Sequence, residues 1–202
     1  MINIEKLIGL KSPLILASAS PRRRKLLKDL GFNFTIQPSN INEEIVEEIS
    51  ETDYAEKLAL AKAQEVASRF NENGIVIGAD TIVVIDNKIL NKPKTKDEAF
   101  EMLNQLSGRT HKVITGLSLV EIISKKYIIS NSQTLVTFRE LEKEEIEAYI
   151  NSGSPFDKAG GYGIQDDFGA VFVSRIEGCY YNVVGLPLEL LYKSLKEFNT
   201  II

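Results

Sequence analysis

The stretch LILASASPRRRKLLKDLG, residues 14–31, decides the fold that we expect of this chain of 202 residues. Its first part, residues 14–18, is an apolar run that predicts a buried strand. Ser20 is a good N-cap and Pro21 suits the first position of a helix, so a helix is predicted to follow at once. Gly31 is placed to end that helix. A strand that passes directly into a helix is typical of an α/β fold.

The rest of the chain mixes strand and helix patterns in the same way. A capping box at residues 95–98 predicts a helix to about residue 106. The remaining expected elements are strands at residues 32–37, 75–79, 81–85, 170–173 and 179–184, a long hairpin of residues 111–123 and 126–138, and helices at residues 53–70, 141–150 and from about 187. Together they predict an α/β fold with an elongated mixed β-sheet flanked by helices. The hairpin is a candidate for a second lobe, with a cleft between the two lobes.

The composition is that of an ordinary globular protein, and we expect one domain over residues 1–202. Hydrophobic residues make up 44% of the chain, but no apolar run approaches the roughly 18 residues that a membrane span needs. The N-terminal residues do not resemble a secretory signal, and the single cysteine, Cys179, cannot form an intramolecular disulfide. We therefore expect a cytoplasmic protein. The net charge of −4 argues against a general binder of nucleic acids or anionic membranes.

An unusual cluster of arginines follows the first predicted strand. Three of the seven arginines are consecutive, at residues 22–24, in a chain that has 17 lysines. Arginine suits forked recognition of phosphate, and a helix start offers free N–H groups and a positive dipole. Ser18, Ser20, Arg22 and Arg23 would complete a site for a polyphosphate. A well-capped, solvated basic helix is the alternative, and these residues alone support both interpretations about equally.

Asp80 lies between two uninterrupted apolar runs, in the stretch GADT at residues 78–81. A carboxylate in such a place is costly to bury unless it is paired, bound to a metal or placed in a cleft. The alternative is an ordinary turn aspartate that follows Gly78. The length of the flanking runs favours a functional aspartate.

Three other charged residues are weaker candidates. Lys62 lies in the alanine-rich predicted helix, where its stem could be buried while its ammonium reaches a pocket. Lys92 lies in the stretch NKP, residues 91–93. Lysines are usually solvated, so each alone is weak evidence. Glu43 could be a second carboxylate beside a metal or part of an acidic surface, and the surface interpretation is favoured by default.

The stretch DKAGGYGIQ, residues 157–165, has three glycines within four residues. Its backbone could therefore pass close to a ligand, although a glycine-rich turn is an equally good interpretation. His111, the only histidine, lies in an alternating strand pattern, which favours a structural role over base catalysis. Cys179 is interpreted as a half-buried strand residue.

Five stretches of the chain resemble, in order and spacing, the Maf-type nucleoside triphosphate pyrophosphatases. They are LASASPRR (16–23), LALAKA (58–63), GADTIVV (78–84) with NKP (91–93), LSGRTHKVITG (106–116), and KAGGYGIQ (158–165) with NVVGLPLELL (182–191). The similarity runs from about residue 13 to 195. It implies a fold related to the inosine triphosphate pyrophosphatases, with a phosphate-lined cleft. It also implies hydrolysis of a nucleoside triphosphate to the monophosphate and pyrophosphate.

The resemblance implies roles for individual residues. The family's catalytic aspartate falls on Asp80, which would act as general base or as ligand of a divalent metal, Mg²⁺ or Mn²⁺, with Glu43 as a further metal ligand. The phosphate-binding residues would be Ser18, Ser20, Arg23, Lys62 and Lys92. A homodimer is expected on the same ground. The alternative function is a nucleotide-binding regulator of cell division or septum formation that does not need turnover, and the presence of Asp80 argues against it.

Arg22, Thr81 and Gln165 resemble the dTTP/UTP branch of that family at three positions from three separate motifs. The branch associated with 7-methyl-GTP typically has an aromatic residue, Gln and Glu there. The expected substrates are therefore dTTP, UTP and related pyrimidine nucleotides, modified ones included. An amide such as that of Gln165 can pair with both the N3–H donor and the carbonyl acceptors of uracil or thymine.

Overall fold

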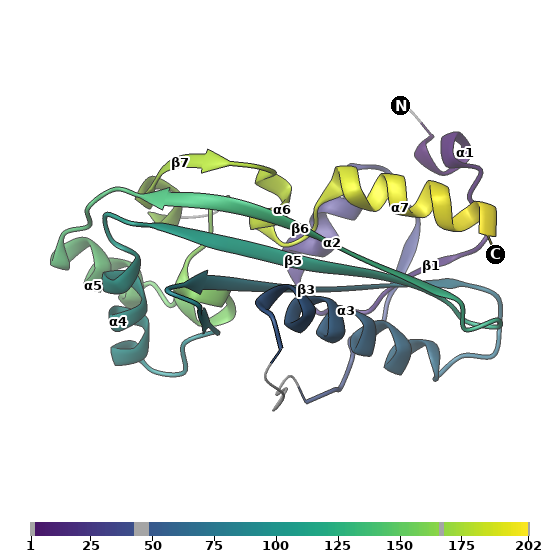
Figure 1. Cartoon of the computed structure of the whole chain (residues 1–202), viewed down its shortest axis with the longest axis horizontal. Helices are drawn as coiled ribbons and strands as arrows, with labels where there is room; N and C mark the ends of the chain where they lie inside the picture. The colour runs from purple at the N-terminus through teal and green to yellow at the C-terminus, as the bar shows by residue number, and fades with distance from the viewer. Residues whose placement is uncertain (1–2, 43–48, 166–167, 202) are drawn as a thin grey trace. The chain divides into compact units, whose positions relative to one another are not determined.

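The computed structural model describes residues 3–42, 49–165 and 168–201. In chain order the elements are α1 (Ile4–Ile8), β1 (Leu14–Leu16), α2 (Pro21–Asp29), β2 (Phe34–Ile36), α3 (Glu51–Ala67), β3 (Ile75–Ile85), β4 (Lys88–Leu90), α4 (Lys96–Leu106), β5 (Thr110–Glu121), β6 (Tyr127–Phe138), α5 (Lys143–Asn151), the 3₁₀ helices η1 (Ser154–Asp157), η2 (Ala159–Gly161) and η3 (Phe168–Phe172), β7 (Val173–Glu177), α6 (Tyr180–Val184) and α7 (Leu188–Ile201) (Figure 1). None of the helices in these described ranges is both long and apolar enough to cross a membrane.

The seven strands form one mixed sheet, which confirms the predicted α/β fold. Its strand order is β2-β1-β3-β5-β6-β7, with β4 paired to β3. Strand β1 is parallel to both β2 and β3, whereas the β3–β4 and β6–β7 pairs are antiparallel. Strands β1, β2 and the first part of β3 therefore end at the same edge, as parallel strands joined by crossover helices must.

The chain divides into two compact units, and each unit uses separate stretches of sequence. Unit 1 comprises Met1–Asp80, Thr115–Ser132 and Gly185–Ile202, and unit 2 comprises Thr81–Ile114 and Gln133–Val184. The prediction that the long hairpin forms a lobe of its own is wrong. Its turn end belongs to unit 1 and its open end to unit 2, because β5 and β6 each continue from one unit into the other.

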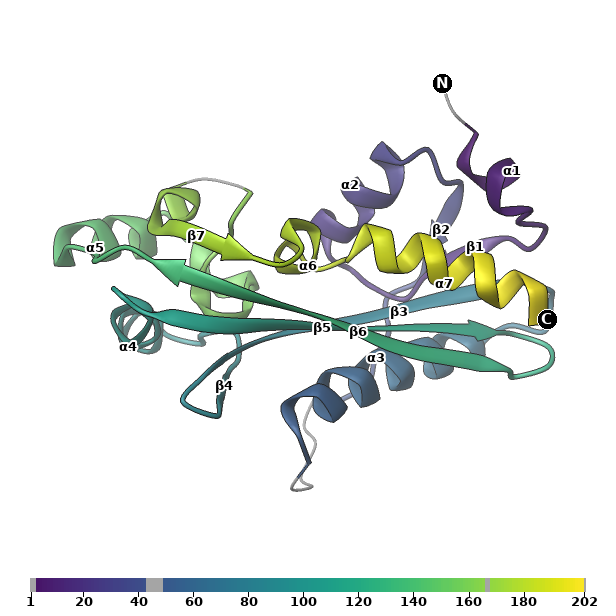
Figure 2. The ribbon, with the colours of Figure 1, turned by 45° about the horizontal axis from the view of Figure 1, so that its top comes forward.

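In unit 1, helix α3 packs unusually closely on the sheet. It buries a face of small residues that includes Ala55, Ala59 and Ala63. A Cβ atom placed on Gly78 of β3 would lie 2.1 Å from the carbonyl oxygen of Ala59, and one on Gly116 would lie 2.3 Å from that of Ala55. Figures 1 and 2 show α3 running along β3. Only glycine at these two strand positions permits that helix–strand distance, since any side chain would meet backbone.

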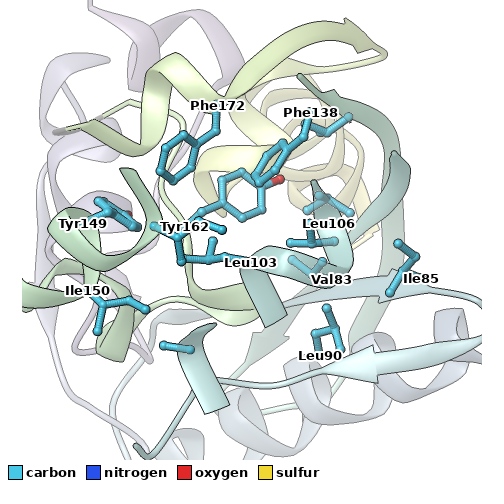
Figure 3. Packing of buried hydrophobic residues seen from close by; sticks show 14 residues of the cluster. Val83, Ile85, Leu90, Leu103, Leu106, Phe138, Tyr149, Ile150, Tyr162 and Phe172 are labelled. Carbon is cyan, nitrogen blue, oxygen red and sulfur yellow. The ribbon is translucent and has the colours of Figure 1, made fainter. Parts of the chain in front are cut away.

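Unit 2 has an aromatic core. The rings of Phe138 and Tyr162 pack edge-to-face with their centroids 4.7 Å apart, and those of Tyr149 and Phe172 do so at 5.2 Å (Figure 3). Helices α4 and α5 pack against each other beside this cluster and contribute Leu103, Leu106 and Ile150 to it. Such edge-to-face pairs are worth about 0.5–1.5 kcal/mol each beyond the area that they bury.

Two predicted strands near the C-terminus are wrong. Residues 180–184 form helix α6 instead of a strand, with Cys179 just before the helix, and residues 170–172 belong to η3, so that β7 starts at Val173. The amide of Asn182 donates to the carbonyl oxygen of Cys179 at 3.1 Å and closes a helical turn. The buried side chain of Asn182 also donates to the carbonyl of Val113 at 3.0 Å and to Thr134 Oγ1 at 2.8 Å. These tertiary hydrogen bonds hold the segment as a helix despite its β-branched valines.

Candidate active site

Asp80 lies inside a strand and not in a turn. Strand β3 is continuous from Ile75 to Ile85, so the interpretation of Asp80 as a turn residue is wrong. The strand around it is otherwise mostly buried and hydrophobic, with Thr81 half-buried, and Asp80 itself is only 7% exposed. A carboxylate in such surroundings needs a partner, because burying an unpaired charge is far more costly than burying a paired one.

Lys62 supplies that partner. Its Nζ lies 2.6 Å from Asp80 Oδ1, and each of the two side chains is only 10% exposed. Lys62 is next to Ala63, whose Cβ atom packs 2.9 Å from the Cβ position of Gly78, two residues before Asp80. The close approach of α3 to β3 therefore places the ammonium at the carboxylate. Removing one member of a buried pair leaves the other charge uncompensated, at a cost of about 3–5 kcal/mol.

Ser18 lies at the same edge of the sheet as Asp80. In the parallel pair of β1 and β3, Leu16 is in register with Ile77, and the amide of Ala17 donates to the carbonyl of Ile77 at 2.9 Å. Ser18 and Asp80 follow these paired residues on adjacent strands. The carboxyl ends of parallel strands are where α/β sheets place their ligand-binding groups.

Helix α2 begins at Pro21, three residues after Ser18, and is capped as predicted. Ser20 is the N-cap, its Oγ accepts from the amide of Arg23 at 3.4 Å, and Pro21 takes the first helical turn. The amide of Ser20 donates in turn to Ser18 Oγ at 3.2 Å. The first turn holds arginines and no acidic residue. Cations there oppose the helix dipole, so this helix start favours a bound anion.

Arg23 is more buried than a solvent-facing phosphate ligand. It is 9% exposed, its Nη1 donates to Ser18 Oγ at 3.1 Å, and its Nε donates to the carbonyl of Gly185 at 2.7 Å. It thereby fixes the start of α2 against the residues that lead into α7. Arg22, in the same turn, is half-buried.

Unit 2 contains three further predicted site residues. Thr81, the next residue of β3, and Gln165 are half-buried, whereas Lys92 is exposed after β4. The amide of Gly160 donates to the carbonyl of Asn91 at 3.2 Å, so the glycine-rich segment lies against the stretch that carries Lys92. Gly160 and Gly161 have φ angles of 67° and 72°, and the segment therefore needs glycine for its backbone path.

Sequence reasoning missed two residues, one in each unit. One is Lys158, which is only 8% exposed although it stands in a glycine-rich loop. Its position beside Asp157 was the available signal. The other is Gly185, whose carbonyl accepts from Arg23 across 162 residues of sequence, a contact that no local pattern indicates. Glu43 lies outside the described residues.

His111 belongs to the aromatic core of unit 2. It is 2% exposed, and its Nε2 lies 2.7 Å from the hydroxyl of Tyr162. Burial lowers the pKa of His111 to about 4 and raises the pKa of Tyr162. A histidine held neutral among aromatic rings fits the structural role that its strand pattern predicts.

The described part of the chain contains no group of three or more His, Cys, Asp or Glu side chains placed to hold a metal ion. Asp80 is the buried carboxylate of the site. A single carboxylate fits Mg²⁺ or Mn²⁺ of the kind that arrives with a nucleotide, because such ions are bound by one or two carboxylates together with substrate phosphates and water. The donor set therefore suits a metal that is shared with a triphosphate.

Comparison with known proteins gives consistent results. Residues 13–198 match the family described as Maf-like protein. The dTTP/UTP pyrophosphatase of Alkaliphilus oremlandii is 51% identical over 87% of this chain and 90% of its own length. That of Thermoanaerobacter sp. strain X514 is 49% identical over 92% and 97%, and that of Desulforamulus reducens is 46% identical over 93% and 97%.

A solved structure of a dITP/XTP pyrophosphatase from Mycobacterium abscessus aligns with 64% of this chain and 75% of its own. The TM-score is 0.39 and the sequence identity is 13%. The family match and the relatives, by contrast, cover nearly the whole chain. The protein that carries this buried Lys62–Asp80 pair beside an arginine-rich helix start belongs to the Maf-like protein family.

Proposed function

We propose that this protein hydrolyses nucleoside triphosphates, with dTTP and UTP preferred, to the nucleoside monophosphate and pyrophosphate. The observation that carries the proposal is the buried Lys62–Asp80 pair at the edge of the sheet where Ser18 and the start of α2 also lie. The relatives at 46–51% identity, which bear the name dTTP/UTP pyrophosphatase, support the choice of reaction and substrate. A regulator without turnover would have no need to bury this pair.

Asp80 is proposed to act on the attacking water. Its carboxylate would take a proton from a water molecule that attacks the α-phosphorus, while the bond from this phosphorus to the α–β bridging oxygen breaks and pyrophosphate leaves. Lys62 would orient the carboxylate through its 2.6 Å contact and add positive charge as the bridge breaks. Asp80 and Glu43 would hold a bound Mg²⁺ or Mn²⁺, which supplies charge neutralisation on the triphosphate.

The start of α2 is proposed to bind the phosphates. Its free N–H groups and dipole favour an anion, and the guanidinium of Arg22 would add a forked donor. Ser18, Ser20 and Arg23 form the hydrogen-bonded framework of this helix start. Lys92 would add a further positive charge. In this arrangement Arg23 contributes mainly by holding Ser18 in place.

Arg22, Thr81 and Gln165 are proposed to set the choice of base. The Gln165 amide offers one donor and one acceptor, which match the imide edge of uracil or thymine. CTP should be a poor substrate, because its N3 is an acceptor and its exocyclic N4 is a donor. None of these groups reads the ribose 2′-OH or the thymine methyl, so UTP and dTTP should both be accepted.

Identification of the products tests the reaction. Incubation of the protein with UTP and Mg²⁺ or Mn²⁺, followed by ³¹P NMR, should show UMP and pyrophosphate. Accumulation of UDP and orthophosphate would refute the proposed cleavage site.

Replacing Gln165 by Glu tests the choice of base. The variant should lower kcat/KM for UTP by roughly 5- to 150-fold, because an unpaired polar group at the base edge costs about 1–3 kcal/mol. The homodimer stays a prediction, which sedimentation at micromolar concentration would check.

A further inference from the structure

Lys158 occupies an unusual position in the glycine-rich segment of unit 2. It stands between η1 and η2, and its side chain is 9% exposed. A buried cation in a glycine-rich loop usually suggests a ligand for phosphate. The contacts of this lysine indicate a different role.

The ammonium of Lys158 is fully used within its own segment. Its Nζ donates to the carbonyl oxygen of Ser154 at 2.6 Å, to Ser154 Oγ at 3.0 Å and to Asp157 Oδ1 at 2.8 Å. An ammonium has three N–H donors, so these three acceptors satisfy it completely. Asp157 also balances its charge. Little remains for an incoming phosphate.

The stem of Lys158 lies directly over Gly163. A Cβ atom on Gly163 would be 2.7 Å from Lys158 Cε and 3.0 Å from Lys158 Cδ. Gly169 also lies close to Gly163, since a Cβ atom on Gly169 would be 2.9 Å from the carbonyl oxygen of Gly163 and 2.7 Å from the hydroxyl of Tyr149. The backbone at Gly163 is therefore confined by the lysine stem and by Gly169. Gln165 follows two residues later.

We propose that Lys158 is a positioning residue for Gln165. It joins η1 to the backbone at Gly163 and so fixes where the Gln165 amide is presented. This inference rests on the proposed function, in which Gln165 reads the pyrimidine base. Because hydrogen-bond readout of a base edge depends on placement within a fraction of an ångström, loosening this contact should affect substrate choice more than the chemical step.

Replacing Lys158 by Met tests the proposal. Methionine keeps an unbranched apolar stem of similar length and removes the ammonium. We expect kcat/KM for UTP to fall by about 10- to 100-fold, mainly through KM. The values for CTP and GTP should change much less, so the preference for UTP shrinks. Lys143→Met on α5 is the matched control, because that lysine side chain is 69% exposed in the same unit.

Gly163→Ala tests the same contact without removing a charge. The new methyl group would push away the far end of the lysine side chain, which can move, and it meets no backbone within 3.0 Å. This variant should therefore fold and should show the same loss of preference for UTP. It keeps the proposal open to refutation if Lys158→Met fails to fold.

A double-mutant cycle separates positioning from a general structural role. If Lys158 acts through Gln165, adding Lys158→Met to Gln165→Glu should cost little more than Gln165→Glu alone. Additive losses, or a fall in activity that is equal for UTP, CTP and GTP, would overturn the positioning role. If Gln165→Glu changes substrate preference and neither Lys158→Met nor Gly163→Ala does, only the role of Lys158 fails. If Gln165→Glu leaves the preference unchanged, the assignment of Gln165 fails and the role of Lys158 falls with it.

Discussion

A buried pair of polar side chains in unit 1 and one in unit 2 differ in charge. In unit 1 the Lys62–Asp80 pair joins an ammonium to a carboxylate at 2.6 Å. In unit 2 the His111–Tyr162 pair joins an imidazole to a phenol at 2.7 Å, among aromatic rings. The neutral pair needs no compensating charge, which suits a core. A buried ion pair gains little net stability, so its presence in unit 1 is better explained by chemistry than by folding.

Asp80→Asn should give the largest effect. The asparagine is nearly isosteric, but it can neither take a proton nor bind a metal well. We therefore expect UTP turnover to fall by roughly 10²–10⁴-fold. The measurement is the initial rate of pyrophosphate release. A variant that keeps more than about a tenth of the wild-type rate would remove Asp80 from the mechanism.

Stability needs its own control in that experiment, because the variant leaves the Lys62 ammonium without its carboxylate. The double variant Lys62→Met with Asp80→Asn removes both charges of the pair. It should recover stability relative to Asp80→Asn while remaining inactive. Recovery of activity in the double variant would contradict a catalytic role for Asp80.

The neutral pair predicts a pH dependence of stability. The pKa of His111 is about 4 in the folded protein, against about 6.5 unfolded, so the unfolded chain binds more protons between these values. Stability from this group is therefore present above pH 6.5 and is lost as the pH falls through this range. The free energy of unfolding should drop by about 3 kcal/mol between pH 6.5 and 4, since each unit is worth 1.36 kcal/mol. Urea titrations should show a drop that is larger by about this amount for the wild type than for His111→Gln, since carboxylates with lowered pKa, such as Glu145, titrate in both proteins; equal drops would refute the assignment.

Gly78→Ala tests what holds Lys62 against Asp80. The new methyl group would meet the backbone of α3, 2.1 Å from the carbonyl of Ala59, so the helix must shift. We expect a loss of about 1–3 kcal/mol in unfolding free energy together with a loss of turnover in the folded fraction. Gly74→Ala is the control, because its methyl group would meet mainly the end of the Ile122 side chain, at 2.9 Å. If both variants behave alike, the close packing at Gly78 does not position the pair.

The smallest effects should come from two matched helix caps. Ser20 caps α2 in unit 1, and Thr95 caps α4 in unit 2 by accepting from the amide of Glu98 at 3.1 Å. Replacing either by Ala should cost about 1 kcal/mol of stability. Only Ser20→Ala should also raise KM for UTP, because the start of α2 is the proposed phosphate site. Equal KM values in the two variants would argue against that site.

Local signals in the sequence predicted most of the fold. Caps and stop signals placed α2 and α4 within a few residues, since a cap depends on residues that are close in the chain. Residues 179–184 were wrongly predicted as a strand because a short β-branched run has no clear period. Its state is decided by hydrogen bonds from Asn182 to residues 48 and 69 positions away.

The sequence identified individual residues of the candidate site but not the contacts between them. Asp80 and Lys62 were each singled out, yet their pairing depends on the helix–strand approach at Gly78, which no periodic pattern encodes. Lys158, by contrast, was not predicted as a site residue at all. A lysine beside glycines gives no sign of burial until the path of the loop is known.

The path of the chain through the two units has a consequence for fragments of this protein. Strand β3 crosses from unit 1 to unit 2 between Asp80 and Thr81, and unit 1 is completed only by residues 185–202. Neither unit is a continuous piece of sequence. A single proteolytic cut followed by separation of the pieces, or synthesis halted at any internal residue before α7, therefore yields no self-sufficient half. Unit 1 contains the first residues to leave the ribosome, but it cannot fold completely until α7 has been synthesised. Its folding is therefore completed only after synthesis of nearly the whole chain.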